Sequence, residues 1–360
     1  MKKWAMRIVG VLAALLLLLV VAVYLATFHP AALQDEPVAC AQSAPQLQAG
    51  QPLKILTWNV QYMAGKSYVF FSDLPEGEYA PDERPSPEEI AKTLGEVARV
   101  IRAENPDVVL LQEVDDGAAR TDYQDELARL LPLLPPEYAC STTAFYWKAA
   151  YVPHPRIHGA AGMKLAIVSK YRIAGARRHQ LPLMPNDPLS QQFNLKRAIL
   201  EARLPVAGGG DFVALDTHLD AFAQGNDTMA QQVAQVDDLL AQLTGAGLPW
   251  VIGGDFNLLP SEQARAALIP SHQGFYNPQT EIAPLYARYQ AAPSYAETSG
   301  PDSARWFTYN ANDPAIKAPD RTLDYLFFAK DVRLGQHYVR QSDTLRVSDH
   351  LPLIAEIKLP

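Results

Sequence analysis

The stretch VIGGDFNLLP, residues 251–260, places a carboxylate and a carboxamide two residues apart at the end of an apolar run. The two side chains belong to Asp255 and Asn257, and the run before them predicts a buried strand. A single aspartate at a strand end is most often a turn or capping residue. The question is therefore whether the ends of other strands carry similar side chains.

Four further apolar runs border carboxylates, carboxamides or imidazoles. They place Asn59 after residues 53–58, Glu113 in 107–114, His218 at the end of 212–218, and Asp349 with His350 before 352–359. Carboxylate and carbonyl oxygens suit Mg²⁺, which binds through one or two carboxylates together with phosphate oxygens. No H-E-x-x-H, C-x-x-C, P-loop or G-x-S-x-G motif supports a zinc peptidase, a nucleoside triphosphatase or a serine hydrolase. The pattern predicts a metal-assisted reaction at a phosphate ester.

Strands and helices alternate around these residues. Ser86, Pro87 and Glu89 form the start of a helix that Asn105-Pro106 ends, and a second helix is predicted over residues 228–244. Besides the runs above, short β-branched and aromatic segments predict strands at 164–169, 249–255 and 323–329. Apolar strands mixed with helices predict an α/β domain whose sheets are covered on their outer faces.

The motifs resemble those of the metal-dependent endonuclease/exonuclease/phosphatase superfamily, which includes deoxyribonucleases, abasic-site endonucleases and neutral sphingomyelinases. In chain order they are TWNV, LLQEV, KLAIVSKYRI, THLDA, GGDFN, LDYLFF and SDHLP, which together span residues 57–352. The resemblance implies a four-layer α/β sandwich, two packed mixed β-sheets flanked by helices, with the active site at one rim. It also implies Mg²⁺ as the cofactor, with Mn²⁺ as a substitute.

The resemblance further implies a role for each matching residue. Glu113 is expected to be the main metal ligand, with Asn59 and Asp349 completing the metal site. Asp255 is expected to orient or deprotonate the attacking water, while Asn257 hydrogen-bonds a phosphate oxygen. His350, held by Asp324, is expected to act on the phosphoryl centre, and His218 near the leaving group. Gln61 replaces the aspartate that abasic-site endonucleases carry at this position, which argues against that specificity and against a second metal.

Three basic residues are candidate phosphate contacts, namely Lys164, Arg172 and Arg197, although solvation at the surface is the commoner fate of a single basic side chain. Residues 142–159 concentrate Phe145, Tyr146, Trp147 and Tyr151 among basic residues. Such a segment can face a substrate or a membrane. The alternative, which is the commoner case, is that these rings form a small core beneath a long loop.

The N-terminus has the composition of a membrane anchor. Residues 1–7 carry Lys2, Lys3 and Arg7, and residues 8–28 form an uncharged apolar run of the length that crosses a bilayer as a helix. The basic residues predict that the N-terminus is cytoplasmic and the domain extracytoplasmic, or periplasmic in a Gram-negative cell. A cleaved signal peptide is the alternative, but its apolar core is usually shorter and its small-residue cleavage site lies closer.

Residues 29–51 are rich in Ala, Pro and Gln without periodicity and predict a linker, followed by one catalytic domain over 52–360. Cys40 and Cys140 are the two cysteines. In an oxidising compartment they are expected to form a disulfide, although two free thiols are nearly as compatible with the sequence.

Charge bears on the class of substrate. Without the three basic residues before the apolar run, 28 Lys and Arg remain against 39 Asp and Glu, a formal charge of −11. Five of these acidic residues lie in the connection from Tyr62 to Pro85. Such a surface disfavours long nucleic acids, whose binding depends on neutralised phosphates.

The leading hypothesis is therefore a membrane-anchored phosphodiesterase acting on a phospholipid, a glycolipid or another small diester. The alternatives are an extracytoplasmic nuclease and a noncatalytic binding module. No protein partner is implied.

Overall fold

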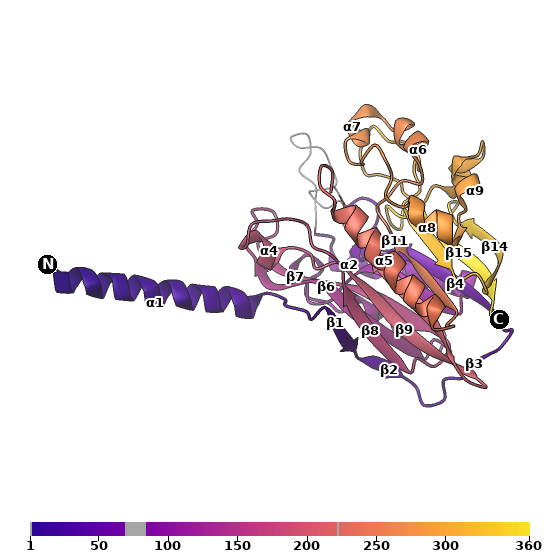
Figure 1. Cartoon of the computed structure of the whole chain (residues 1–360), viewed down its shortest axis with the longest axis horizontal. Helices are drawn as coiled ribbons and strands as arrows, with labels where there is room; N and C mark the ends of the chain where they lie inside the picture. The colour runs from indigo at the N-terminus through magenta and orange to yellow at the C-terminus, as the bar shows by residue number, and fades with distance from the viewer. Residues whose placement is uncertain (1, 69–83, 222) are drawn as a thin grey trace.

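The computed structural model describes residues 2–68, 84–221 and 223–360, so most of the acidic connection between Tyr62 and Pro85 lies outside the described residues. Beyond an N-terminal helix, the chain forms two packed β-sheets with helices on their outer faces (Figure 1). The prediction of a four-layer α/β sandwich is confirmed.

The first sheet is mixed, and its two central strands run parallel. In spatial order its strands are β14 (Arg333–Val339), β15 (Leu353–Lys358), β4 (Pro52–Asn59), β5 (Val108–Asp115), β7 (Gly159–Ser169), β6 (Cys140–Val152) and β2 (Val38–Cys40). Strand β7 is antiparallel to β5, and β15 is antiparallel to β4. The beginnings of β7 and β15 therefore lie at the edge where β4 and β5 end.

The second sheet is also mixed, with β10 and β11 parallel. In spatial order its strands are β1 (Leu33–Glu36), β8 (Gly175–Gln180), β9 (Ala198–Ala207), β10 (Asp211–His218), β11 (Trp250–Asp255), β13 (Asp324–Phe328) and β12 (Gln290–Ala292), while β3 (Leu47–Gln48) pairs with β9. The facing sides of the two sheets share one large apolar core.

Two long helices cover the outer faces. Helix α2 (Pro87–Glu104) begins with the predicted capping box of Ser86 and Glu89, and its apolar side joins a second core with the outer side of β4 and β5. Helix α5 (Thr228–Gly245) lies across the second sheet (Figure 1). The shorter helices are α3 (Glu126–Leu130), α4 (Ser190–Phe193), α6 (Glu262–Ala266), α7 (Pro270–Gln273), α8 (Ala283–Arg288) and α9 (Tyr295–Ser299), with 3₁₀ turns η1 (Gln61–Met63), η2 (Ala119–Thr121), η3 (Leu131–Leu133) and η4 (Ser303–Trp306).

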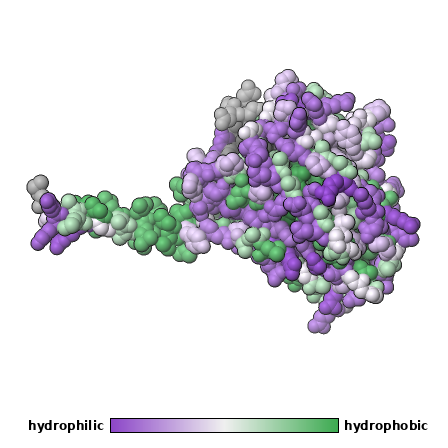
Figure 2. Space-filling model, viewed as in Figure 1, coloured by the Kyte–Doolittle hydropathy of each residue, from purple (hydrophilic) through white to green (hydrophobic). Residues whose placement is uncertain are grey.

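Helix α1 (Lys2–Ala26) projects away from the domain with an apolar surface along most of its length (Figure 2). It begins earlier and ends two residues sooner than the predicted span over residues 8–28. None of its residues is buried. Its length and composition fit a membrane-spanning helix, and a signal sequence passes the same test.

The predicted linker over residues 29–51 contains secondary structure. These residues contain β1, β2 and β3, which pair with β8, β6 and β9 respectively. Each strand has four residues or fewer, and their mostly exposed or half-buried side chains explain why the sequence shows no periodicity. Cys40 and Cys140 are register partners of β2 and β6 and form a disulfide.

Candidate active site

The polar strand ends converge at one edge of the sandwich, which we call the catalytic edge. The parallel pairs β4–β5 and β10–β11 end there, so that His218 is the register partner of Asp255. Asp255 is also the register partner of Asp324 on β13. The segment before β15 brings Asp349 and His350 to the same edge. The structure therefore brings together the eight residues predicted to act in catalysis or metal binding.

Asn59 links two of the carboxylates. Its Nδ2 atom donates to Oε1 of Glu113 at 3.0 Å and to Oδ2 of Asp255 at 3.1 Å. Its Oδ1 atom accepts a hydrogen bond from the backbone N–H of Gln61 at 3.0 Å. In this orientation the amide of Asn59 positions the carboxylates, and its oxygen is already engaged.

Two imidazoles approach the same oxygen of Asp255. The Nε2 atoms of His218 and His350 lie 3.3 Å and 3.4 Å from Oδ2 of Asp255. The Nδ1 atom of His350 lies 2.8 Å from Oδ2 of Asp324, which is the length of a charge-assisted hydrogen bond. The Nδ1 atom of His218 lies 3.3 Å from the hydroxyl of Tyr146.

Burial and neighbouring charges shift the pKa values of the two histidines in opposite directions. Burial alone would lower the pKa of His350, but the charges of Asp324 and Asp255 outweigh it and raise that pKa well above its ordinary value. Burial, reinforced by Arg197, holds the pKa of His218 well below its ordinary value. Burial also raises the pKa of Asp255 to about 7. One imidazole is therefore charged and the other neutral beside a carboxylate that titrates near neutrality.

Glu113 and Asp349 form the pair best suited to a divalent cation. Both line a cavity of about 350 Å³ that His218 and Gln61 also line. Burial raises the pKa of both carboxyls, and the charge of Asp349 raises that of Glu113 further. A hard cation bound between oxygen ligands would relieve this repulsion, so the residues present fit Mg²⁺ or Mn²⁺.

The backbone holds Glu113 in an uncommon conformation. Its φ is 58°, in the left-handed region that non-glycine residues rarely adopt. The register of β5 against β7 shifts between Leu111 and Val114, around this residue. A bulge of this kind redirects a side chain at a sheet edge, and backbone strain is common at functional sites.

Asp255, Asp324 and His350 form a second group of potential metal ligands, whose ligand atoms lie within 4.8 Å of one another. The short contact between His350 and Asp324 explains this grouping as a hydrogen-bonded pair beside a third carboxylate. Glu113 and Asp349 are not members of this group.

Hydrogen bonds to β4 and η1 fix the segment that carries Asp349 and His350. The backbone N–H of Asp349 donates to Oε1 of Gln61 at 3.0 Å, and Ser348 Oγ donates to the carbonyl of Asn59 at 2.8 Å. Trp58 Nε1 donates to the carbonyl of His350 at 2.9 Å. Gln61, the residue that departs from the abasic-endonuclease motif, thus positions Asp349.

Asn257 lies two residues after β11 with a φ of 51°. Its backbone N–H donates to Oδ1 of Asp255 at 2.9 Å, and its Nδ2 donates to the carbonyl of Leu219 at 3.2 Å. Asn257 therefore ties the ends of β10 and β11 together beside the site.

The three predicted phosphate contacts have different environments. Arg197 lines the cavity, and its Nε atom lies 3.3 Å from Oδ1 of Asp220. Its Nη1 atom is buried without a hydrogen-bond partner among the described residues. Lys164 is buried near the catalytic edge, but its ammonium contacts Asp116 at 3.0 Å and Asp125 at 3.4 Å.

The prediction for Arg172 is wrong. This residue follows the end of β7, and β7 is antiparallel to β5, so Arg172 lies at the opposite edge. Its backbone N–H donates to the carbonyl of Pro45 there.

Further residues at the cavity escaped the sequence analysis. Arg120 follows β5 on η2, contacts Asp115 at 2.8 Å and lies 3.6 Å from the ring centroid of Tyr62. Tyr309 lines the cavity with its ring centroid 4.8 Å from that of His350. No sequence pattern marks these two residues. Trp147 also lines the cavity, and it belongs to the aromatic segment noted in the sequence.

Comparisons with known proteins agree with this geometry. Residues 56–350 match the model of the Endonuclease/Exonuclease/phosphatase family. Among solved structures, an endonuclease/exonuclease/phosphatase from Beutenbergia cavernae has a TM-score of 0.56 and 24% identity over 86% of this chain and 72% of that one. The catalytic domain of human Nocturnin, with bound sulfate, has a TM-score of 0.52 and 17% identity over 89% and 96% of the two chains.

A mannosyl-6-phosphatase from Bacteroides thetaiotaomicron has a TM-score of 0.50 and 16% identity over 85% of this chain and 99% of that one. No curated protein matches the chain. At these identities the solved structures establish the fold, whereas the family match extends over the segment that carries the assembled residues, from Asn59 to His350. The chain therefore belongs to the Endonuclease/Exonuclease/phosphatase family of hydrolases.

Proposed function

We propose that this protein is a membrane-anchored, divalent-metal-dependent phosphodiesterase that hydrolyses a phospholipid, a glycolipid or another small diester outside the cytoplasm. The observation that carries the chemistry is the arrangement around one cavity. Glu113 and Asp349 line the cavity with His218 and offer oxygen ligands. Behind them the buried Asp255 lies beside the neutral imidazole of His218 and the protonated imidazole of His350. These are the groups needed to bind a cation and to activate water against a phosphate ester.

Glu113 and Asp349 would hold the cation, and Mg²⁺ or Mn²⁺ would neutralise charge on the nonbridging phosphate oxygens. Asp255 accepts the proton of the attacking water, because a base whose pKa lies near 7 works efficiently at neutral pH. The protonated His350, held by Asp324, stabilises the charge that develops on the phosphoryl group.

Two further side chains act on the substrate. His218 is neutral and lines the cavity beside Asp255, where it donates a hydrogen bond to the leaving oxygen. The guanidinium of Arg197, whose buried Nη1 has no hydrogen-bond partner in the described part of the chain, binds a nonbridging oxygen.

Two observations support an extracytoplasmic domain. Basic residues lie in the first turns of α1, before its apolar run, as in proteins whose N-terminus is cytoplasmic. The bond between Cys40 and Cys140 belongs to the kind that persists in oxidising compartments. A reporter enzyme that works only outside the cytoplasm should therefore be active when it is fused after Pro360. Activity of a reporter that works only in the cytoplasm would contradict this topology.

Activity is tested with the full chain, in detergent and in vesicles, at neutral pH with Mg²⁺. The substrates are a phosphatidylcholine, a soluble aryl phosphodiester, a phosphomonoester and plasmid DNA. We expect hydrolysis of the lipid and of the soluble diester, and slow DNA cleavage that falls as salt rises. Rapid plasmid nicking at physiological salt without lipid turnover would favour the nuclease instead. No turnover of any substrate would favour a noncatalytic binding module.

A further inference from the structure

The end of α1 is fixed to the catalytic domain. Thr27 forms a β-bridge with Ala149 of β6, and the ring centroid of Phe28 lies 6.4 Å from that of Phe145 on the same strand. The buried guanidinium of Arg178 lies 5.5 Å from the ring centroid of Phe28 and donates through Nε to the carbonyl of Phe145 at 2.8 Å. Since β1 then pairs with β8, the helix is joined to the domain through a continuous set of contacts.

This junction lies beside the catalytic cavity. Trp147 lines the cavity and is two residues from Ala149, where α1 is bridged to β6. The indole of Trp147 donates to the carbonyl of Phe193 at 2.8 Å, which ties α4 to the same strand. The segment around α4 forms a wall of the cavity through Met184, Asn194 and Leu195.

Exposed apolar side chains gather on the segments around the junction. Outside α1, eight large hydrophobic residues are exposed among the described residues, and four of them lie on these segments. The four, which we call the contact face, are Leu33 on β1, Tyr151 on β6, and Leu183 and Leu189 before α4.

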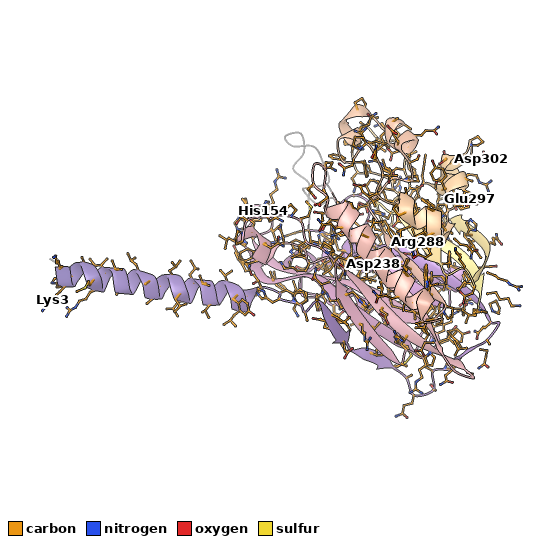
Figure 3. The ribbon with its side chains drawn as sticks, in the orientation of Figure 1. Lys3, His154, Asp238, Arg288, Glu297 and Asp302 are labelled. Carbon is orange, nitrogen blue, oxygen red and sulfur yellow. A yellow bond between two sulfur atoms is a disulfide. The ribbon has the colours of Figure 1, made fainter. Side chains whose placement is uncertain are left out.

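The surroundings of the contact face also fit a lipid surface. Lys148 and Arg156 are exposed on the hairpin between β6 and β7. His154, on the same hairpin, lies on the side of the domain from which α1 extends (Figure 3). Aromatic and basic side chains of this kind are typical of the membrane–water interface.

We propose that the contact face rests on the bilayer that α1 spans, so that the cavity receives its phosphodiester from the lipids of that bilayer. This inference rests on the proposed membrane-anchored phosphodiesterase and assigns its substrate to the lipid class. The bilayer is the occupant that the structure favours over a second copy of the chain. The reason is that the four residues of the face lie on β1, β6 and the segment before α4, and that β1, α4 and the end of α1 all contact β6. Helix α1 is apolar, and none of its residues is buried. The fixed junction would hold the domain in one orientation rather than on a flexible tether.

The orientation is measured with tryptophan reporters in the full chain, reconstituted in phosphatidylcholine vesicles that contain brominated acyl chains. Tyr151→Trp reports on the contact face, where Tyr151 is 49% exposed. Tyr295→Trp is the matched control, because Tyr295 is 52% exposed on α9, at the end of the domain opposite α1. We expect bromolipid to quench the added emission of Tyr151→Trp and to leave that of Tyr295→Trp unchanged.

Equal quenching of the two reporters, or none in Tyr151→Trp, would overturn the inference. Emission of Tyr151→Trp that changes with the protein-to-lipid ratio but is not quenched would assign the face to a second copy, and would also overturn it. If Tyr151→Trp is quenched but the chain hydrolyses no phosphoester, the proposed function fails while the contact face stands.

A turnover measurement tests the functional consequence. Leu189→Glu should lower hydrolysis of vesicle phospholipid roughly tenfold and leave hydrolysis of a soluble diester unchanged. Leu133→Glu, at an exposed leucine beside the carboxyl end of α2, should change neither rate. Equal lipid turnover by the two variants would contradict delivery of substrate across the contact face.

Discussion

The Nδ1 atom of His350 lies 2.8 Å from Oδ2 of Asp324, and both side chains are buried at the catalytic edge. Asp324 therefore fixes the imidazole and keeps it protonated, while the Nε2 atom of His350 lies 3.4 Å from Oδ2 of Asp255. The pair joins β13 of the second sheet to the segment before β15 of the first sheet, 26 residues further along the chain.

Asp324→Asn should lower kcat of diester hydrolysis by about a hundredfold or more, with little change in KM. The carboxamide keeps the shape of the side chain but removes the charge that holds His350 protonated, so the loss falls on the transition state. Steady-state kinetics of the purified variant measure it. A kcat equal to that of the unsubstituted chain would show that Asp324 only caps its strand.

Arg197→Gln should lower kcat/KM by about tenfold or more, because a charge-assisted hydrogen bond to phosphate is lost. Arg172→Gln is the matched control at the opposite edge and should leave kcat/KM unchanged. The two variants are compared on the same diester. Equal losses of kcat/KM in the two variants would mean that Arg197 acts only through the net charge of the protein and not through a contact with phosphate.

Asp216→Asn should stabilise the protein at neutral pH by about 1–3 kcal/mol. Asp216 lies between the sheets, where Gln112 Nε2 donates to its Oδ1 at 2.6 Å. Its Oδ2 and the Oε1 of Gln112 are buried without partners among the described residues. Burial raises the pKa of Asp216 well above its ordinary value.

The sign of the pH dependence follows from this shift. Asp216 binds its proton more tightly in the folded state than in the unfolded state. The stability that the protonated Asp216 contributes is therefore fully present below about pH 4, and it is lost as the pH rises toward the pKa of the folded state. Urea unfolding of the unsubstituted chain and of Asp216→Asn between pH 4 and pH 8 should show a difference in unfolding free energy that grows with pH. A constant difference would contradict a raised pKa.

Much of the site could be predicted because strand direction collects residues that are distant in the sequence. The apolar runs ending at Asn59, Glu113, His218 and Asp255 identify parallel strand ends, and parallel strands end at a common edge. Arg172 was misplaced because no sequence pattern shows that β7 runs antiparallel to β5.

The remaining features depend on tertiary packing. Arg120 reaches the cavity only because η2 folds back beside β5, and Tyr309 only because it bridges to His350. The strands of residues 29–51 escaped prediction because they are short edge strands, stabilised by their partners in the sheets rather than by an apolar pattern.

Reduction of the disulfide between Cys40 and Cys140 should lower the free energy of unfolding by about 4–5 kcal/mol, because the two residues are 100 positions apart and close a long loop. Urea unfolding with and without reductant measures the change, and Cys140→Ser should reproduce it. No change on reduction, with the bond shown to be broken, would mean that strand pairing alone holds the N-terminal segment.

The most direct test of the account is the cation dependence of diester hydrolysis by the full chain, compared with Glu113→Gln. Turnover should stop in EDTA and return with Mg²⁺ or Mn²⁺, because in the proposed reaction Glu113 and Asp349, which line the cavity, would supply the oxygen ligands of the cation. Glu113→Gln should abolish turnover at every cation concentration without lowering the unfolding midpoint, because it removes a buried carboxylate that Asp349 repels. Turnover that survives both EDTA and this substitution would contradict a metal-dependent reaction at this site.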